Sequence, residues 1–310
     1  SPGGPAAGGG PGAGEAALPD GATYVGEWLG ERAHGRGLCA FVGGGCYEGQ
    51  WAHGTPHGEG CDHLQDGRSY SGQFVRGGWT GKGAVTSVEG ALEYSGLFFE
   101  GRLHGEGERR WPDGQRYFGQ FSRGAPHGLG CLTCPDGRTH IGFFVEGECH
   151  GEGVCRRSDG AVYAGQWAAG LRHGDGSDAA GDGSWYVGQH RQGERGGAGQ
   201  LLDANGGLYE GEFAEGAFHG AGSFAWLDGC RYEGAFERGR FHGRGTLAWI
   251  NGCRFAGEFS KGKQDGPGEY TDALGRQWSG EWSRGRSTRL SLSGDVAAEE
   301  AAREAAVAAG

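Results

Sequence analysis

The sequence predicts an all-β fold, an elongated single-layer antiparallel β-meander built from about twelve β-hairpin repeats of 23 residues. Three observations predict it: the chain holds 73 Gly in 310 residues, it holds 10 Trp, 10 Tyr and 15 Phe, and the two classes recur in a fixed register. Glycine at this level without a period is typical of low-complexity chains, whereas disordered segments are poor in aromatic residues. A repeat that combines both classes accounts for the composition.

The period appears when the chain is aligned on the pattern Tyr-x-Gly-x-aromatic. Successive copies begin 23 residues apart, except for one step of 24 residues between Tyr70 and Tyr94. A Gly follows every start by two residues, and Trp or Phe follows by four residues except where His190 stands. The twelve copies begin at Tyr24, Tyr47, Tyr70, Tyr94, Tyr117, His140, Tyr163, Tyr186, Tyr209, Tyr232, Phe255 and Trp278.

The unit that begins at Tyr209 shows how the pattern builds structure. Side chains alternate along a strand, so Tyr209 and Phe213 share one face and Glu210 lies on the other. A turn at Gly216 leads into a second strand, and Asp228-Gly229 is a strong hairpin signal because Gly tolerates a positive φ. Each repeat is therefore predicted to contribute two short antiparallel strands, with an aromatic, Gly-lined side and a charged side.

Two places depart from the pattern. The extra residue within 86–93 predicts a bulge before Tyr94. The eighth copy, which begins at Tyr186, has His190 and Gly196 where other copies have an aromatic residue and a His. We expect a weak joint in this copy.

The two ends of the chain lie outside the repeat. Residues 1–19 are rich in Gly, Pro and Ala, which predicts a disordered N-terminal segment. The repeat array is predicted to span residues 20–286, and residues 287–310 form a tail. Residues 295–308 of this tail are rich in Ala and Glu, which predicts a short helix.

Charge and cysteine content limit the classes of partner and compartment. The net charge is −11 and the pI is about 5.5, so the chain lacks the basic footprint of nucleic-acid binding, and binding to anionic membrane lipids is disfavoured. The nine Cys are an odd number, and no apolar run approaches the roughly 20 residues needed to span a bilayer. We expect an intracellular, soluble protein of the cytoplasm or cytoskeleton.

Several residue groups resemble chemical sites, but their repetition favours a structural role. A row of His invites a metal site, yet side chains in register run parallel and do not converge as ligands must. Cys131-x-x-Cys134 lacks two further ligands in matching positions, and Gly257–Gln264 resembles a P-loop without its final Ser or Thr. We therefore predict no catalytic, cofactor-binding or metal-binding residues. The His row comprises His34, His57, His104, His127, His150, His173, His219 and His242.

The aromatic row is the candidate partner-binding face. A single-layer sheet leaves apolar area uncovered, and large exposed apolar patches usually mark interfaces. We expect this face to accept a helix or strand of another protein, or a second copy in a homodimer, unless the rings only stack to hold the sheet together. The candidate residues are Tyr24, Trp28, Tyr47, Trp51, Tyr70, Phe74, Tyr94, Phe98, Tyr117, Phe121, Tyr163, Trp167, Tyr209, Phe213, Tyr232, Phe236, Trp226 and Trp249.

The repeat also carries His-Gly-x-Gly, as in His57-Gly58-Glu59-Gly60 and His242-Gly243-Arg244-Gly245, and Asp-Gly before the next start. With the aromatic motif, this consensus closely resembles the MORN (membrane occupation and recognition nexus) repeat over residues 20–286. The resemblance implies a non-enzymatic assembly scaffold, most similar to the radial spoke head and cytoskeletal arrays of a cilium or flagellum axoneme. The alternative that it implies is a regulatory, phosphoinositide-associating segment of a larger protein such as a phosphatidylinositol phosphate kinase. A stand-alone enzyme is disfavoured, because an active site is normally unique.

Overall fold

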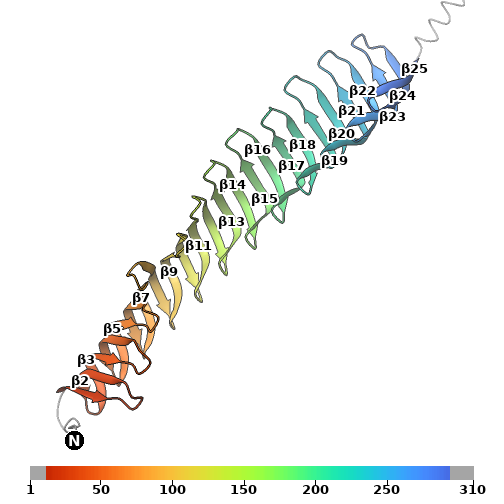
Figure 1. Ribbon diagram of the computed structural model, residues 1–310. Coiled ribbons are helices and arrows are strands. Elements are labelled where there is room, and N and C mark those ends of the chain that lie inside the picture. The colour runs from red at the N-terminus through yellow and green to blue at the C-terminus, as the bar shows by residue number, and fades with distance from the viewer. Residues whose placement is uncertain (1–11, 294–310) are drawn as a thin grey trace, which may run out of the picture. The chain divides into compact units, whose positions relative to one another are not determined.

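The computed structural model of the protein describes residues 12–293, and every regular element within them is a β-strand (Figure 1). The chain divides into two compact units, residues 1–158 (unit 1) and 159–310 (unit 2). Within each unit the strands pair antiparallel with their neighbours in chain order, which confirms the predicted all-β hairpin meander. Among the described residues, no helix has the length and apolar character needed to cross a membrane.

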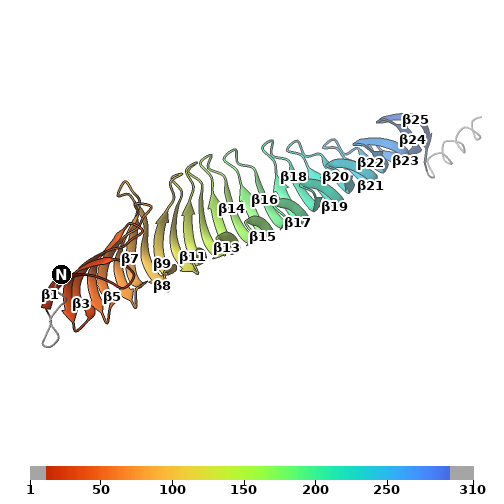
Figure 2. The same cartoon turned by 60° about the horizontal axis from the view of Figure 1, so that its bottom comes forward.

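Unit 1 carries its strands in six complete hairpins that follow one N-terminal strand (Figure 2). Each first strand bears the aromatic motif, and each second strand bears the His-Gly-x-Gly motif except β7, where Thr80 takes the place of the His. The strands are β1 (Gly12–Ala17), β2 (Thr23–Leu29), β3 (Arg32–Ala40), β4 (Cys46–Ala52), β5 (Thr55–His63), β6 (Ser69–Val75), β7 (Gly78–Thr86), β8 (Leu92–Phe99), β9 (Arg102–Arg110), β10 (Arg116–Ser122), β11 (Ala125–Thr133), β12 (Thr139–Val145) and β13 (Glu148–Arg156).

Unit 2 repeats the same scheme in six further hairpins. The strands are β14 (Val162–Ala168), β15 (Leu171–Ala179), β16 (Trp185–Arg191), β17 (Glu194–Leu202), β18 (Leu208–Ala214), β19 (Ala217–Ala225), β20 (Arg231–Glu237), β21 (Arg240–Ala248), β22 (Arg254–Ser260), β23 (Lys263–Thr271), β24 (Gln277–Ser283) and β25 (Arg286–Leu292).

Two different tight turns join the strands. The first turn of a repeat has two central residues with positive φ, as at Glu215 (50°) and Gly216 (75°), which is the type I′ geometry that matches strand twist. The second turn is a type I turn followed by a Gly at positive φ. There, the Gly229 amide donates to the Trp226 carbonyl at 3.0 Å, and Asp228 Oδ1 accepts from the amide two residues on at 2.9 Å. The turn predicted from Asp228-Gly229 is therefore confirmed.

A β-bulge in the second strand of each hairpin explains the His-Gly-x-Gly motif. In β19 the register is Gly211 with Gly222 but Glu212 with His219, so two residues of β19 have no partner in β18. Gly220 takes φ +58° at this bulge. The Gln or Glu before the motif aromatic stabilises this bulge. For example, Gln50 Oε1 accepts a hydrogen bond of 2.9 Å from the backbone amide of Glu59, which lies in the bulge of β5. This bulge is not apparent from the periodicity alone.

Strand pairing extends beyond both limits that were predicted for the array. β1 pairs with β2, and the Trp28 indole N–H donates to the Gly14 carbonyl at 3.1 Å, so the predicted disordered segment 1–19 contains an ordered strand. The physical reason is that the outer edge of β2 has open backbone groups that any extended chain can satisfy. At the other end, β25 pairs with β24 to complete the last hairpin. The predicted tail helix and residues 1–11 lie outside the described residues.

The two predicted irregularities have different outcomes. The bulge before Tyr94 is confirmed, because Val85 pairs with Tyr94 but Thr86 pairs with Leu92, which leaves Glu93 unmatched. The eighth repeat is a hairpin like the others, since β16 pairs with β15 without a register shift and with β17 with the same bulge that the other hairpins have. A weak joint in hydrogen exchange at this repeat therefore stays a prediction.

Candidate functional site

The aromatic rings meet because each first strand bends sharply at the motif Gly. Side chains four residues apart on a straight strand are separated by about 13 Å. The rings of Tyr24 and Trp28 are instead 5.0 Å apart and nearly perpendicular, so the strand folds at Gly26 toward the side that carries them. The Trp51 ring of the next repeat also lies 5.0 Å from Tyr24. Trp51 is thereby held between Tyr24 and Tyr47, in the edge-to-face geometry that aromatic pairs prefer, and the same arrangement recurs along the array with His140 or Phe255 in place of one Tyr.

Glycine is required where two paired strands lie beneath the Tyr ring. A Cβ on Gly49 would lie 2.5 Å from both the Cα of Gly60 and the hydroxyl of Tyr47, which is too close for any side chain. The Tyr47 hydroxyl donates to the Gln50 carbonyl at 2.8 Å, and the Trp51 indole N–H donates to a carbonyl of the preceding repeat at 3.1 Å. The motif is thus one packing unit. Two glycines leave room for the Tyr ring, and the Tyr hydroxyl and the Trp indole N–H both donate hydrogen bonds to backbone carbonyls.

Of the two alternatives for the aromatic row, burial in the structure favours stacking that holds the sheet together for most of its residues. The bend closes the two arms of the strand over the rings, so most candidate side chains are buried and offer no surface to a partner. The buried candidates are Tyr24, Trp28, Tyr47, Trp51, Tyr70, Phe74, Tyr94, Phe98, Tyr117, Phe121, Tyr163, Tyr209, Phe213, Tyr232 and Phe236. Trp167, Trp226 and Trp249 are half-buried.

Burial also fixes the protonation state of these tyrosines. Removal from water raises the pKa to about 12 in seven of them, because the phenolate form is the one that burial penalises. They therefore act as neutral hydrogen-bond donors at any physiological pH. The seven are Tyr47, Tyr70, Tyr94, Tyr117, Tyr186, Tyr209 and Tyr232.

Histidine replaces an aromatic residue at two buried positions. His140 occupies a Tyr position, packs edge-on to Phe144 at 5.2 Å, and burial lowers its pKa to about 4. His190 occupies a Trp or Phe position, and its Nε2 lies 3.0 Å from the Asp178 carboxylate. Burial alone would raise the pKa of Asp178, but His190 and Arg172, which donates to it at 2.7 Å, together hold that pKa below its usual range. His190 thus keeps the edge-on packing, with its ring 5.1 Å from both Tyr163 and Tyr186, and adds a polar contact to the seventh repeat.

The ring side remains open to solvent in unit 2, over β19, β21 and β23. Seven apolar side chains, here called the unit 2 aromatic trough, are half-buried and lie above the buried rings. Phe224 is 4.8 Å from Trp226, Trp226 is 5.8 Å from Phe241, and Trp249 is 6.3 Å from Tyr270 between ring centroids. The trough comprises Phe218, Phe224, Trp226, Phe241, Leu247, Trp249 and Tyr270.

Sequence reasoning identified only Trp226 and Trp249 of this trough. The five missed residues all lie on second strands, at positions 9 and 15 after the motif start. The signal that could have found them is that the same positions hold Arg172, Asp178 and Arg195 in the seventh and eighth repeats, but only apolar residues in the ninth and tenth.

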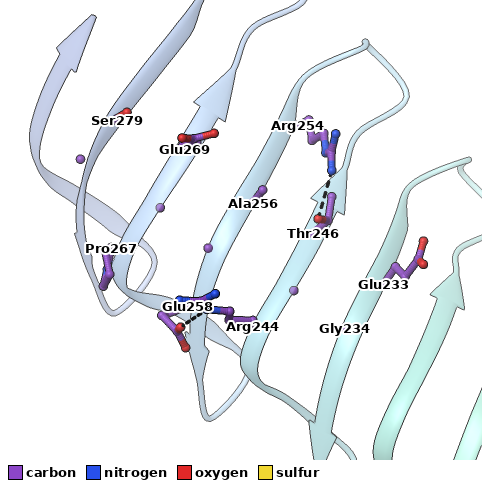
Figure 3. Close-up of a pocket in the computed structure, with 14 residues that line it drawn as sticks. Glu233, Gly234, Arg244, Thr246, Arg254, Ala256, Glu258, Pro267, Glu269 and Ser279 are labelled. Atoms are coloured by element: carbon purple, nitrogen blue, oxygen red, sulfur yellow. Dashed lines mark hydrogen bonds and ion pairs between the residues drawn. The ribbon is translucent and has the colours of Figure 1, made fainter. Parts of the chain in front are cut away.

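The face opposite the rings has a different chemistry. In unit 2 it forms an open hollow of about 980 Å³ whose floor is the column of motif glycines (Figure 3). Charged side chains of both signs line it, and the Arg244 guanidinium pairs with Glu258 at 3.1 Å. Glu233 and Glu269 lie on the other side of the glycine column (Figure 3). This hollow offers no apolar anchor.

The residues of the other candidate sites lie on ordinary strands and turns of the repeat. In residues 12–293, no group of three or more His, Cys, Asp or Glu has an arrangement that could hold a metal ion. Cys131 lies on a strand and Cys134 begins a turn, and both are free thiols. Gly257–Gln264 runs from β22 through a two-residue turn into β23, so the segment is an ordinary hairpin and not a phosphate-binding loop.

Among solved structures, the chain is similar to two centriolar domains at low identity. One is the TCP domain of SAS-4 (dCPAP) from Drosophila melanogaster, in complex with a proline-rich motif of Ana2, with 9% identity, 56% of this chain and 86% of that chain covered, and a TM-score of 0.31. The other is a mutant of the TCP10 domain of Danio rerio CPAP, with 13% identity, 83% and 99% covered, and a TM-score of 0.18. Such TM-scores support no argument about function. No curated protein matches the chain.

The match to a family of sequences is much stronger. The model of the MORN repeat matches nine segments: 24–46, 47–67, 94–116, 117–137, 140–162, 163–177, 209–231, 232–254 and 255–273. These segments cover more than half of the chain and begin at the motif starts found by periodicity. In the structure, eight of them enclose a hairpin whose two strands bend at paired glycines around a ring. The chain therefore belongs to the MORN repeat family.

Proposed function

We propose that the chain is a non-enzymatic scaffold that assembles other proteins, and that the unit 2 aromatic trough is its main docking surface. The observation that carries this proposal is the partly exposed row of aromatic side chains along β19, β21 and β23, above rings that are themselves buried. A fold needs the buried rings. It also uses Phe218 and Phe241, which stack on Tyr209 and Tyr232 and cover them. It does not need Trp226 and Trp249 beyond that layer, and exposed apolar surfaces usually mark interfaces.

The spacing of the trough suits an amphipathic helix laid across the strands. Trp226 and Trp249 hold the same position in successive repeats, two strands apart, and thus about 9.6 Å apart along the sheet. Residues seven apart on a helix are separated by about 10.5 Å along its axis. A helix with apolar residues at this interval would place one on each repeat, as in helix-in-groove recognition.

The setting that we propose is the axoneme of a cilium or flagellum. Its support is the resemblance of long arrays with little else to the radial-spoke and cytoskeletal members of the family. The scaffold would be held there by its protein partners.

The test is affinity purification of the tagged chain from its own cells, followed by mass spectrometry. The Trp226→Ala, Trp249→Ala double variant is compared with Val187→Ser, which changes an exposed apolar residue on the opposite face of unit 2. Far-ultraviolet circular dichroism checks that both variants keep their sheet. Loss of axonemal partners from the double variant alone supports the proposal. Retention of the same partners by the double variant refutes the trough, and recovery of membrane proteins or a lipid kinase without cytoskeletal proteins refutes the ciliary setting.

Contact with a membrane is the second candidate, and one observation favours it. Three successive turns of unit 2 present Leu227, Ile250 and Leu274 at their tips, 75–82% exposed, and an Arg follows each within four residues. Apolar tips with nearby Arg can insert at a lipid surface, although the net charge of −11 opposes the approach to anionic lipids. Flotation with phosphoinositide vesicles tests it: salt-sensitive binding that Leu227→Ser and Ile250→Ser abolish would establish this function, and absence of flotation would exclude it.

A further inference from the structure

Unit 1 carries an apolar patch on the face opposite the rings, where six of the ten other repeats hold a polar residue directly after the motif start. The residue after the motif start is Glu48, Ser71 or Ser95 in three earlier repeats of unit 1, but Phe118 and Ile141 in the fifth and sixth. These neighbouring repeats also hold apolar residues at two further positions of this face. The outer patch comprises Phe118, Leu129, Cys131, Ile141, Phe143 and Val154.

Strand register makes these residues one continuous surface. Phe118 pairs with Cys131, Cys131 with Ile141, and Ile141 with Val154, across β10 to β13. Leu129 pairs with Phe143 in the adjacent row. The exposed fractions are 65% for Phe118, 55% for Leu129, 58% for Ile141 and 46% for Phe143.

The exposed apolar area of the patch is comparable to the apolar centre of a protein–protein interface. Four large apolar side chains, each about half exposed, present roughly 400 Å² to water. A stable interface buries about 800 Å² on each partner, of which the centre is apolar and the rim polar. The patch therefore supplies the centre, and the surrounding charged residues must supply the rim.

Charges of opposite sign stand at opposite corners of the patch. Arg116 and Arg156 lie beside the Phe118 row, toward the Asp-Gly turns, and both are exposed. Glu106, which pairs with Gln120, and Glu152, in the bulge of β13 between the partners of Gly142 and Phe143, lie toward the row of Leu129 and Phe143, and both are also exposed. The patch thus has two basic corners on one side and two acidic corners on the other.

We propose that a second copy of this chain covers the outer patch in a two-fold symmetric dimer. A two-fold axis parallel to the direction in which the strands follow one another places the arginine side of each copy over the glutamate side of the other. Such self-complementarity is what an isologous interface requires. The surface differs from the unit 2 aromatic trough, so this dimer does not depend on the proposed docking function.

Twist limits the dimer to the patch. Two sheets that pack face to face align their strands to within about 30°, and twist makes them diverge away from the contact. The contact therefore extends over β9 to β13, where the apolar residues and the four charged corners lie. The polar outer positions of the earlier repeats, such as Glu48 and Gln50, remain in solvent.

Sedimentation equilibrium of the purified full-length chain tests the dimer. The Phe118→Ser, Ile141→Ser variant is compared with Val25→Ser, Val187→Ser, which changes comparably exposed residues at the same repeat position. Ser occupies this position naturally at Ser71, so the fold tolerates it. We expect the first variant to raise the dimer dissociation constant at least about 100-fold and the second to leave it within a factor of three.

A charge exchange tests the two-fold arrangement. Arg116→Glu with Arg156→Glu makes every corner acidic, and Glu106→Arg with Glu152→Arg makes every corner basic. Each variant alone should be monomeric, and an equimolar mixture should form a heterodimer. A chain that is monomeric at all concentrations, or a dimer that survives the Phe118→Ser, Ile141→Ser change, overturns the proposal. A mixture that stays monomeric overturns the arrangement.

Discussion

His140 makes the stability of unit 1 dependent on pH in a range where carboxylates are mostly ionised. The side chain is 4% exposed, and burial lowers its pKa from 6.5 to about 4 because the charged imidazolium is the form that burial disfavours. Between these two values the unfolded chain binds a proton that the folded chain does not. Stability is therefore unaffected above pH 6.5, falls as the pH falls below 6.5, and levels off below about pH 4.

The two pKa values fix the size of the effect. A pKa difference of one unit corresponds to about 1.4 kcal/mol, so lowering the pH from 7 to 5 should reduce the free energy of unfolding by about 2 kcal/mol. His140→Tyr should remove this loss, because the buried Tyr hydroxyl stays neutral. The slot accepts Tyr, since Gly142 and Gly153 provide the same glycine pair that admits Tyr elsewhere. The new hydroxyl should also add a hydrogen bond worth about 1 kcal/mol at pH 7.

The assay is hydrogen exchange of the β12 amides at pH 5 and pH 7, in the natural chain and in His140→Tyr. Opening free energies are compared after correction for intrinsic exchange, which isolates the local unit and avoids assuming two-state unfolding of a repeat array. All carboxylates titrate equally in both chains, so the difference between the two pH dependences belongs to His140. Equal pH dependence in the two chains would refute the assignment of a buried, neutral imidazole.

Four further substitutions test the packing of the repeat, each by urea unfolding. Gly60→Ala should cost about 2–4 kcal/mol because its Cβ would overlap the Tyr47 ring, whereas Gly78→Ala, whose Cβ meets only one carbonyl at 3.6 Å, should change stability by less than about 0.5 kcal/mol. Gln50→Ala should cost about 1 kcal/mol by leaving the amide of the bulge without its 2.9 Å partner. Glu215→Asn should stabilise by about 0.5–1 kcal/mol, since Asn tolerates the φ of 50° better than Glu.

The periodicity was sufficient to predict the strands and turns, because both depend on residues close in sequence. The Asp-Gly turns, the alternation of faces and the bulge before Tyr94 follow from local chemistry alone. The N-terminal strand was missed for the opposite reason. Composition describes what residues 12–17 prefer in isolation, whereas the open edge of β2 decides what they do in the fold.

The fate of the aromatic row could not be predicted from its spacing. Alternation places Tyr24 and Trp28 on one face, but whether that face is open depends on the angle at Gly26, and no sequence pattern gives an angle. A flat strand would leave both rings in water; the bent strand closes them against each other at 5.0 Å. Most of the predicted docking row is therefore core, and the surface that we propose for docking lies one layer above it.

Comparison of the same position across the copies of a repeat array separates residues that stability requires from residues that are available for binding. A position that holds the same residue type in nearly every copy, such as the motif Gly or Tyr, is explained by the packing that all hairpins share. A position that changes in one or two copies without loss of the hairpin is free of that requirement. Phe118 and Ile141 stand where Ser71 and Glu48 suffice for the same strand pairing, so stability does not explain their exposure. Departures from the repeat, and not the repeat itself, are where the function of this chain is to be sought.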